Sequence, residues 1–107
     1  MIYEKFLEQF TDWRPTTLYW QRFSIAEKFG KEEILTVYLE VFKEAKTDYK
    51  LLTELAMILN HKSWEHCCYN NNSDLCTFYT NLYIEVKNYA CDALKDDELT
   101  YFLTTLD

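Results

Sequence analysis

The apolar residues of this chain recur at the spacing of amphipathic helices. The clearest case is residues 31–46, where the acids Glu40 and Glu44 lie opposite the apolar face. That face is formed by Ile34, Tyr38, Val41, Phe42 and Ala45. The same period predicts helices over residues 2–10, from Thr16 or Thr17 to about Phe29 and over about 74–94. A last helix, with Leu99, Phe102, Leu103 and Leu106 on one side, is expected to follow a hinge at residues 95–97.

One segment, residues 48–68, is apolar on more than one side. Leu52, Leu55, Ala56, Leu59 and Cys67 share a face, whereas Met57, Ile58 and Trp64 fall off it. A helix of this kind is normally covered by neighbours on several sides. We therefore expect residues 48–68 to form the central helix of the fold.

Helix boundaries are marked by few residues. Gly30 lies where a glycine commonly ends a helix, and Asp48 is placed to cap the central helix. The polar loop at 69–74 precedes a helix that Ser73 or Asp74 can cap. The chain of 107 residues has one Gly and one Pro, too few turn residues for many hairpins. The sequence predicts a single all-α domain, residues 1–107, built as a compact bundle of about five to six helices.

Charge narrows the possible partners. The formal net charge is −7, which disfavours direct binding to nucleic acid and to anionic membranes. The same charge favours a protein partner with a basic surface. From Glu85 to the C-terminus there are six acids and only two lysines, Lys87 and Lys95, so this part is the more acidic one.

The expected location is the cytoplasm. Residues 1–10 carry charges inside the stretch that a signal peptide would keep apolar, and no run approaches the about 20 apolar residues of a membrane span. In a reducing cytosol the four cysteines are expected to be free thiols.

Candidate catalytic and metal-binding residues do not form a convincing set. A zinc site would draw on His61, His66, Cys67, Cys68 and Cys76. Adjacent cysteines diverge by about 100° on a helix, and histidines five residues apart do not share a face. A cysteine–histidine nucleophile pair on one helix meets the same obstacle. We expect no metal, no cofactor and no catalytic site.

The candidate contact residues are acids and aromatic rings. The acids at the start of the last helix are explained by capping and the helix dipole, with a role in meeting a basic partner as the alternative. Tyr and Trp side chains are hard to bury together in a small core and are common anchors of interfaces. The predicted partner-binding residues are Glu85, Asp92, Asp96, Asp97, Glu98, Trp64, Tyr79 and Tyr83.

Three stretches resemble a group of small acidic proteins from conjugative and phage-like mobile elements of gut bacteria. They are TTLYWQRFSIAEKFG (16–30), LTELAMILNHKSWEH (52–66) and LYIEVKNYACDALKDDELTYFL (82–103). Aromatic and Leu positions carry the resemblance. It implies a small accessory protein of a mobile element and assigns no functional residue.

Two functions from different classes are compatible with these features. The first is a non-enzymatic protein that binds and inhibits a host defence protein such as a Cas effector, as anti-CRISPR proteins do, by partial mimicry of nucleic acid in a basic groove. The second is a structural or regulatory subunit that forms homodimers or joins a conjugation complex through an apolar patch. A metal- or thiol-dependent enzyme is a third, weaker reading.

Overall fold

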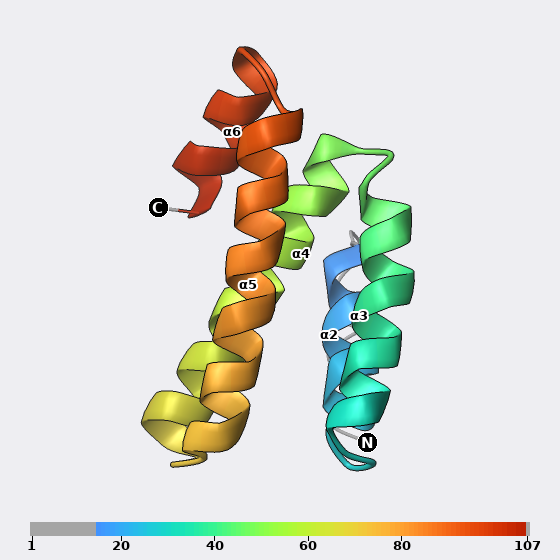
Figure 1. The fold of residues 1–107 in the computed structure, drawn as a ribbon, viewed down its shortest axis with the longest axis vertical. Coiled ribbons are helices and arrows are strands. Elements are labelled where there is room, and N and C mark those ends of the chain that lie inside the picture. The colour runs from blue at the N-terminus through green and yellow to red at the C-terminus, as the bar shows by residue number, and fades with distance from the viewer. Residues whose placement is uncertain (1–14, 107) are drawn as a thin grey trace, which may run out of the picture.

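The protein is a bundle of helices that run alternately up and down (Figure 1). A computed structural model describes residues 15–106. Within this range there are five α-helices and one π-helical segment: α2 (Pro15–Ala26), α3 (Lys31–Ala45), α4 (Tyr49–Trp64), η1 (Glu65–Tyr69), α5 (Ser73–Ala93) and α6 (Asp97–Leu106). The predicted all-α class is confirmed, and the helix expected at 2–10 lies outside the described residues.

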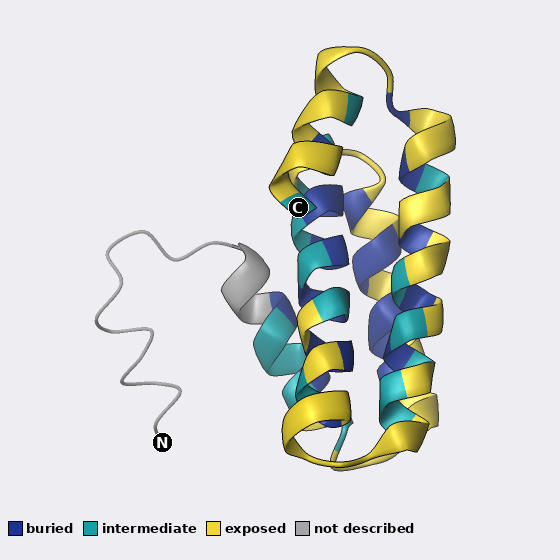
Figure 2. Ribbon diagram, turned by 90° about the vertical axis from the view of Figure 1, so that its left-hand side faces the viewer, coloured by how far each residue is buried: buried dark blue, intermediate teal, exposed yellow. Residues whose placement is uncertain are grey.

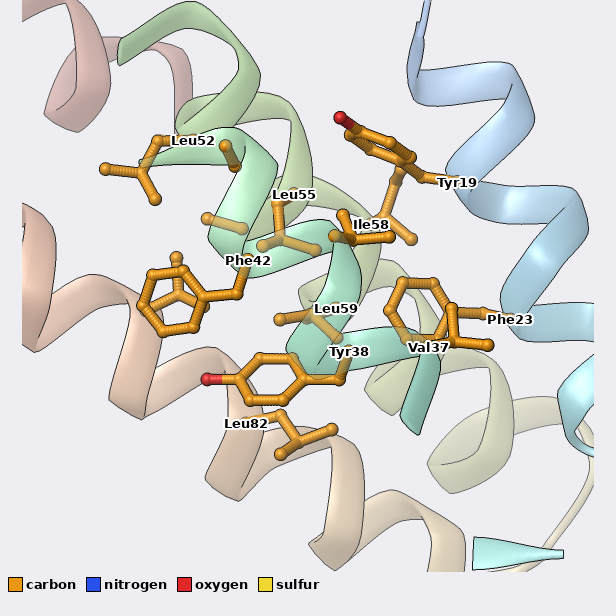
Figure 3. Close-up of a cluster of buried hydrophobic side chains, with 14 of the residues drawn as sticks. Tyr19, Phe23, Val37, Tyr38, Phe42, Leu52, Leu55, Ile58, Leu59 and Leu82 are labelled. Atoms are coloured by element: carbon orange, nitrogen blue, oxygen red, sulfur yellow. The ribbon is translucent and has the colours of Figure 1, made fainter. Parts of the chain in front are cut away.

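Helix α4 is the centre of the bundle, as predicted. It packs against α2, α3, α5, α6 and η1, which explains why its sequence is apolar on more than one side. Leu52, Leu55, Ala56 and Leu59 are all buried in the core. Figure 3 shows Leu55 and Leu59 of α4 among Tyr38 of α3, Phe23 of α2 and Leu82 of α5.

Burial follows the predicted faces. Figure 2 shows the buried residues on the inward sides of the helices and the exposed residues on the outward sides and in the connections. The core of α3 consists of the five predicted residues together with Val37. Among residues 15–106, no helix combines the length and the apolar character needed to cross a bilayer.

The ends of the helices differ in detail from the sequence-based boundaries. Helix α2 begins at Pro15, a residue favoured in the first helical turn, rather than after a cap at Thr16 or Thr17. Gly30 has a φ of 112°, which explains a glycine between α2 and α3. Asp48 caps α4 as predicted, with its carboxylate accepting a 2.9 Å bond from the Lys50 N–H. Asn72, not Ser73 or Asp74, caps α5.

The central helix does not continue as an α-helix to Cys68. It changes at Glu65 into the π-helical segment η1, in which the N–H of Asn70 donates to the carbonyl of Glu65, five residues back. Residues five apart point about 140° apart on an α-helix, and the wider π turn brings them closer to one side. Trp64 and Tyr69 are such a pair.

Candidate functional site

A buried polar cluster joins α2, α4, η1 and α5 at one end of the bundle. Its central acceptor is Oε1 of Glu27, which follows the last residue of α2. This oxygen lies 2.7 Å from Nε2 of His66 and accepts a 2.9 Å hydrogen bond from the hydroxyl of Tyr79. Nζ of Lys62 lies 3.4 Å from the same oxygen. One carboxylate therefore ties four elements together.

Lys62 is almost completely buried, with 2% of its side chain exposed. Its ammonium lies 3.3 Å from Oε2 of Glu65 and donates a 2.7 Å hydrogen bond to the hydroxyl of Ser24. It also lies 4.5 Å from the centre of the Trp20 ring. A buried ammonium is stable only when charges and hydrogen bonds compensate it, and Glu27 and Glu65 supply that compensation.

His66 has partners on both ring nitrogens. Nε2 faces Glu27, and Nδ1 lies 3.3 Å from the side-chain amide nitrogen of Asn70. Nε2 can donate to the Glu27 carboxylate, and the Asn70 amide can donate to Nδ1. The ring also stacks on Tyr79, with centroids 5.6 Å apart. His66 is thus held in place within the cluster.

The pKa of Tyr79 is raised well above that of a free tyrosine. Burial is the main cause, followed by the negative charge of Glu27 and the hydrogen bond to it. The pKa of Tyr38 is raised in the same way, by burial and by its 2.8 Å hydrogen bond to Oε1 of Glu85. Both hydroxyls are therefore neutral donors at physiological pH.

The three groups Glu27, Glu65 and His66 are close enough to be considered as metal ligands, since their ligand atoms lie within 4.8 Å of one another. However, the Lys62 ammonium already lies between the two carboxylates. A divalent cation would have to displace this buried charge, so the geometry fits an internal ion pair better than a metal site.

The zinc set considered from the sequence is not brought together. Cys67 of η1 and Cys76 of α5 are joined in a disulfide, with their Cα atoms 5.2 Å apart. The expectation of four reduced thiols is wrong for this pair, and so is the expectation that Cys67 packs in the core, because Cys67 is exposed. Cys68 and Cys91 are free and exposed. The cytoplasmic location stays a prediction.

Next to the buried cluster, an aromatic cleft opens to the surface. It has a volume of about 570 Å³ and is lined by Trp20, Asn60, His61, Trp64, Glu65 and Tyr69. Trp64 is 62% exposed and Tyr69 84% exposed, whereas Trp20 is half-buried. Glu65 belongs to both the cleft and the buried cluster.

The predicted contact residues do not form one patch. Trp64 lies at the end of α4 that adjoins η1, while the acids Asp92, Asp96, Asp97 and Glu98 lie around the α5–α6 connection. Figure 1 places the η1 end of α4 and the α5–α6 connection at opposite ends of the bundle. All four acids are exposed, and none forms an ion pair with another residue of the described range 15–106.

The remaining predicted residues have other roles. The expectation of an exposed Tyr79 is wrong: it is fully buried, because α5 turns it toward Glu27 and Phe23. Tyr83 is half-buried, with the Lys87 ammonium 5.9 Å from its ring centre. Glu85 is exposed but accepts the hydrogen bond from Tyr38.

Comparisons with protein-family models, with curated proteins and with solved structures found no match for this chain.

Proposed function

We propose that this chain is a non-enzymatic, acidic interaction protein that binds a protein with a basic surface. The observation that carries the proposal is the pair of exposed rings, Trp64 and Tyr69, beside the carboxylate of Glu65 in one cleft. Exposing a large ring to water is unfavourable, and such rings are the commonest anchors of protein interfaces. The π-helical turn that aims both rings outward is a feature often found at functional sites.

Electrostatics favours a basic partner. The chain carries a formal net charge of −7, and the acids at the α5–α6 connection have no cationic partner among residues 15–106. We propose that these acids steer the partner and contact it at a second point, at the other end of the bundle from the cleft.

The internal cluster supports a non-enzymatic role. His66 is the buried imidazole of the cluster, and both of its ring nitrogens are engaged, by Glu27 and by Asn70. A general base needs a nitrogen that can reach the substrate proton. This cluster instead holds the helices in register behind the cleft.

The specific form that we propose is inhibition of a host defence protein, in the manner of anti-CRISPR proteins. Its support is the resemblance of three stretches to proteins of mobile elements, the small size and the acidity. Carboxylates at both ends of the bundle would occupy a Lys/Arg-rich groove that otherwise holds nucleic acid, and the rings of the cleft would anchor the complex.

The test is binding of the purified chain to a panel of Cas effectors, measured at about 50 mM and about 500 mM salt. Two variants that each remove two negative charges distinguish the acids of the proposed contact from the net charge of the chain. They are Asp97→Asn/Glu98→Gln in the first turn of α6 and Glu32→Gln/Glu33→Gln in the first turn of α3. We expect the affinity to fall at the higher salt concentration. We also expect the α6 variant to lower the affinity more than the α3 variant does. No binding at low salt would exclude the Cas form of the proposal.

The alternative function is a structural subunit that associates through an apolar patch. A second cleft of about 260 Å³ lies between α2 and α3, bordered by the exposed side chains of Ile25 and Phe29. Association through such a patch would tolerate salt, because it buries apolar surface. Light scattering at the same two salt concentrations distinguishes the two functions: a salt-resistant dimer would favour the alternative.

A further inference from the structure

We infer that the aromatic cleft binds an arginine side chain of the partner protein, an inference that rests on the proposed function and names its anchor. The cleft combines flat rings, Trp64 and Tyr69, with a carboxylate, Glu65, and an amide, Asn60. A guanidinium group uses all of these at once, because it stacks on rings and donates several hydrogen bonds in one plane.

The chain itself shows that this region accepts a cation. Lys62, on the inner side, places its ammonium 4.5 Å from the Trp20 ring centre and 3.3 Å from Glu65 Oε2. One inner wall of the cleft is therefore already a cation–π and carboxylate environment. Trp64 and Tyr69 offer the same ring chemistry on the outer side.

The single positive charge of Lys62 faces two carboxylates. These carboxylates, Glu27 and Glu65, lie within 3.4 Å of the single ammonium of Lys62. The Glu65 side chain is 36% exposed, so a second cation can reach it from solvent. Such a cation pairs with Glu65 without displacing the buried Lys62.

An arginine fits better than a lysine. The lysine ammonium is a compact, strongly hydrated charge, whereas the guanidinium is more weakly hydrated and matches both a ring face and a carboxylate. The volume of about 570 Å³ is ample for one guanidinium-bearing side chain. His61, whose ring meets the Trp20 ring edge-on at 6.5 Å between centroids, forms a polar wall of the same cleft.

The inference can be tested without the partner. The probes are N-acetyl-arginine amide, its uncharged isostere N-acetyl-citrulline amide, and N-acetyl-lysine amide, each titrated into the full chain and followed by the NMR signals of the tryptophan indoles. We expect saturable shifts with the arginine probe at millimolar concentration, and about tenfold weaker binding of the citrulline probe.

Surface variants provide the controls, since a Glu65 variant would also disturb Lys62. Trp64→Ala should abolish the response, while Phe29→Ala, which removes a 75% exposed ring elsewhere, should leave it unchanged. The inference would be overturned if the citrulline probe bound as tightly as the arginine probe, or if the lysine probe bound as tightly or more tightly. It would also be overturned if Trp64→Ala kept the NMR response to the arginine probe. If Trp64→Ala still bound a partner protein in a salt-dependent way, the cleft would not be the anchor. The proposed function would then still stand.

Discussion

Tyr79 on α5 donates a 2.9 Å hydrogen bond to Glu27, although 52 residues separate the two in the chain. Glu27 also faces His66 and Lys62, so its one oxygen is the point where α2, α4, η1 and α5 are joined. The cleft adjoins this junction, because two of its lining residues, Trp64 and Glu65, lie between Lys62 and His66 in sequence. The stability of the cluster and the geometry of the cleft are therefore linked.

Replacing Lys62 by Met should destabilise the protein strongly. The variant keeps the apolar stem but leaves Glu27 and Glu65 without their buried counter-charge. Breaking a buried ion pair from one side typically costs about 3–5 kcal/mol. Urea unfolding followed by circular dichroism measures the change in the free energy of unfolding.

The control for this variant is Lys50→Met, at an exposed lysine in the first turn of α4. Its effect should stay within about 0.5 kcal/mol, as for ordinary surface substitutions. If Lys62→Met cost no more than the control, the buried cluster would not contribute to stability as described.

The protein should lose stability in alkali. The pKa values of Tyr38 and Tyr79 are raised in the folded state by burial and by Glu85 and Glu27. Their contribution is complete below the unfolded pKa of about 10 and falls above it, because the unfolded chain then releases protons that the folded chain retains. Each tyrosine should reduce the free energy of unfolding by about 1.4 kcal/mol per pH unit above pH 10.

Two substitutions that each remove one hydroxyl group test whether the buried tyrosines cause the loss of stability in alkali. Tyr79→Phe should remove one tyrosine's share of the alkaline slope, whereas Tyr69→Phe, at the most exposed ring of the cleft, should not alter it. Denaturant unfolding between about pH 9 and pH 11 supplies the slopes. Identical slopes for wild type and Tyr79→Phe would mean that Tyr79 ionises freely, contrary to its position.

Reduction of the Cys67–Cys76 disulfide should destabilise η1 and its junction with α5. The bridge closes a loop between residues 9 positions apart, for which the chain-entropy model predicts about 2–3 kcal/mol. Unfolding with and without reductant measures the loss, and the double variant Cys67→Ser/Cys76→Ser should be insensitive to reductant. Alkylation of the unreduced protein should modify only Cys68 and Cys91. Modification of all four cysteines would show that the bridge is absent.

Much of the fold was predictable because it follows from local patterns. The period of apolar residues located α3 and α5 to within one residue at each end, and Asp48 and Gly30 marked boundaries for reasons of cap chemistry and backbone conformation. The two-sided apolar character of 48–68 identified the central helix, because that pattern reports directly on the number of neighbours.

The site was not predictable to the same extent, since it depends on contacts between distant segments. Lys62 and His66 are four residues apart, the spacing of one helix face, but nothing local indicates that Glu27 and Tyr79 meet them there. The turn to π geometry at Glu65 has no simple sequence signal, and it separates Cys67 from the core. The separation of the acids of 92–98 from Trp64 could not be predicted, because residue spacing does not encode the directions of the helices.

The most direct test of the central claim is capture of a partner from a bacterial lysate by three immobilised proteins: wild type, Trp64→Ala and Phe29→Ala. Recovery is quantified by mass spectrometry at low and high salt. We predict a protein with a basic surface that wild type and Phe29→Ala recover equally at low salt. Its recovery should fall at least about tenfold with Trp64→Ala and at high salt. Equal recovery by all three proteins, independent of salt, would contradict an acidic domain anchored through its aromatic cleft.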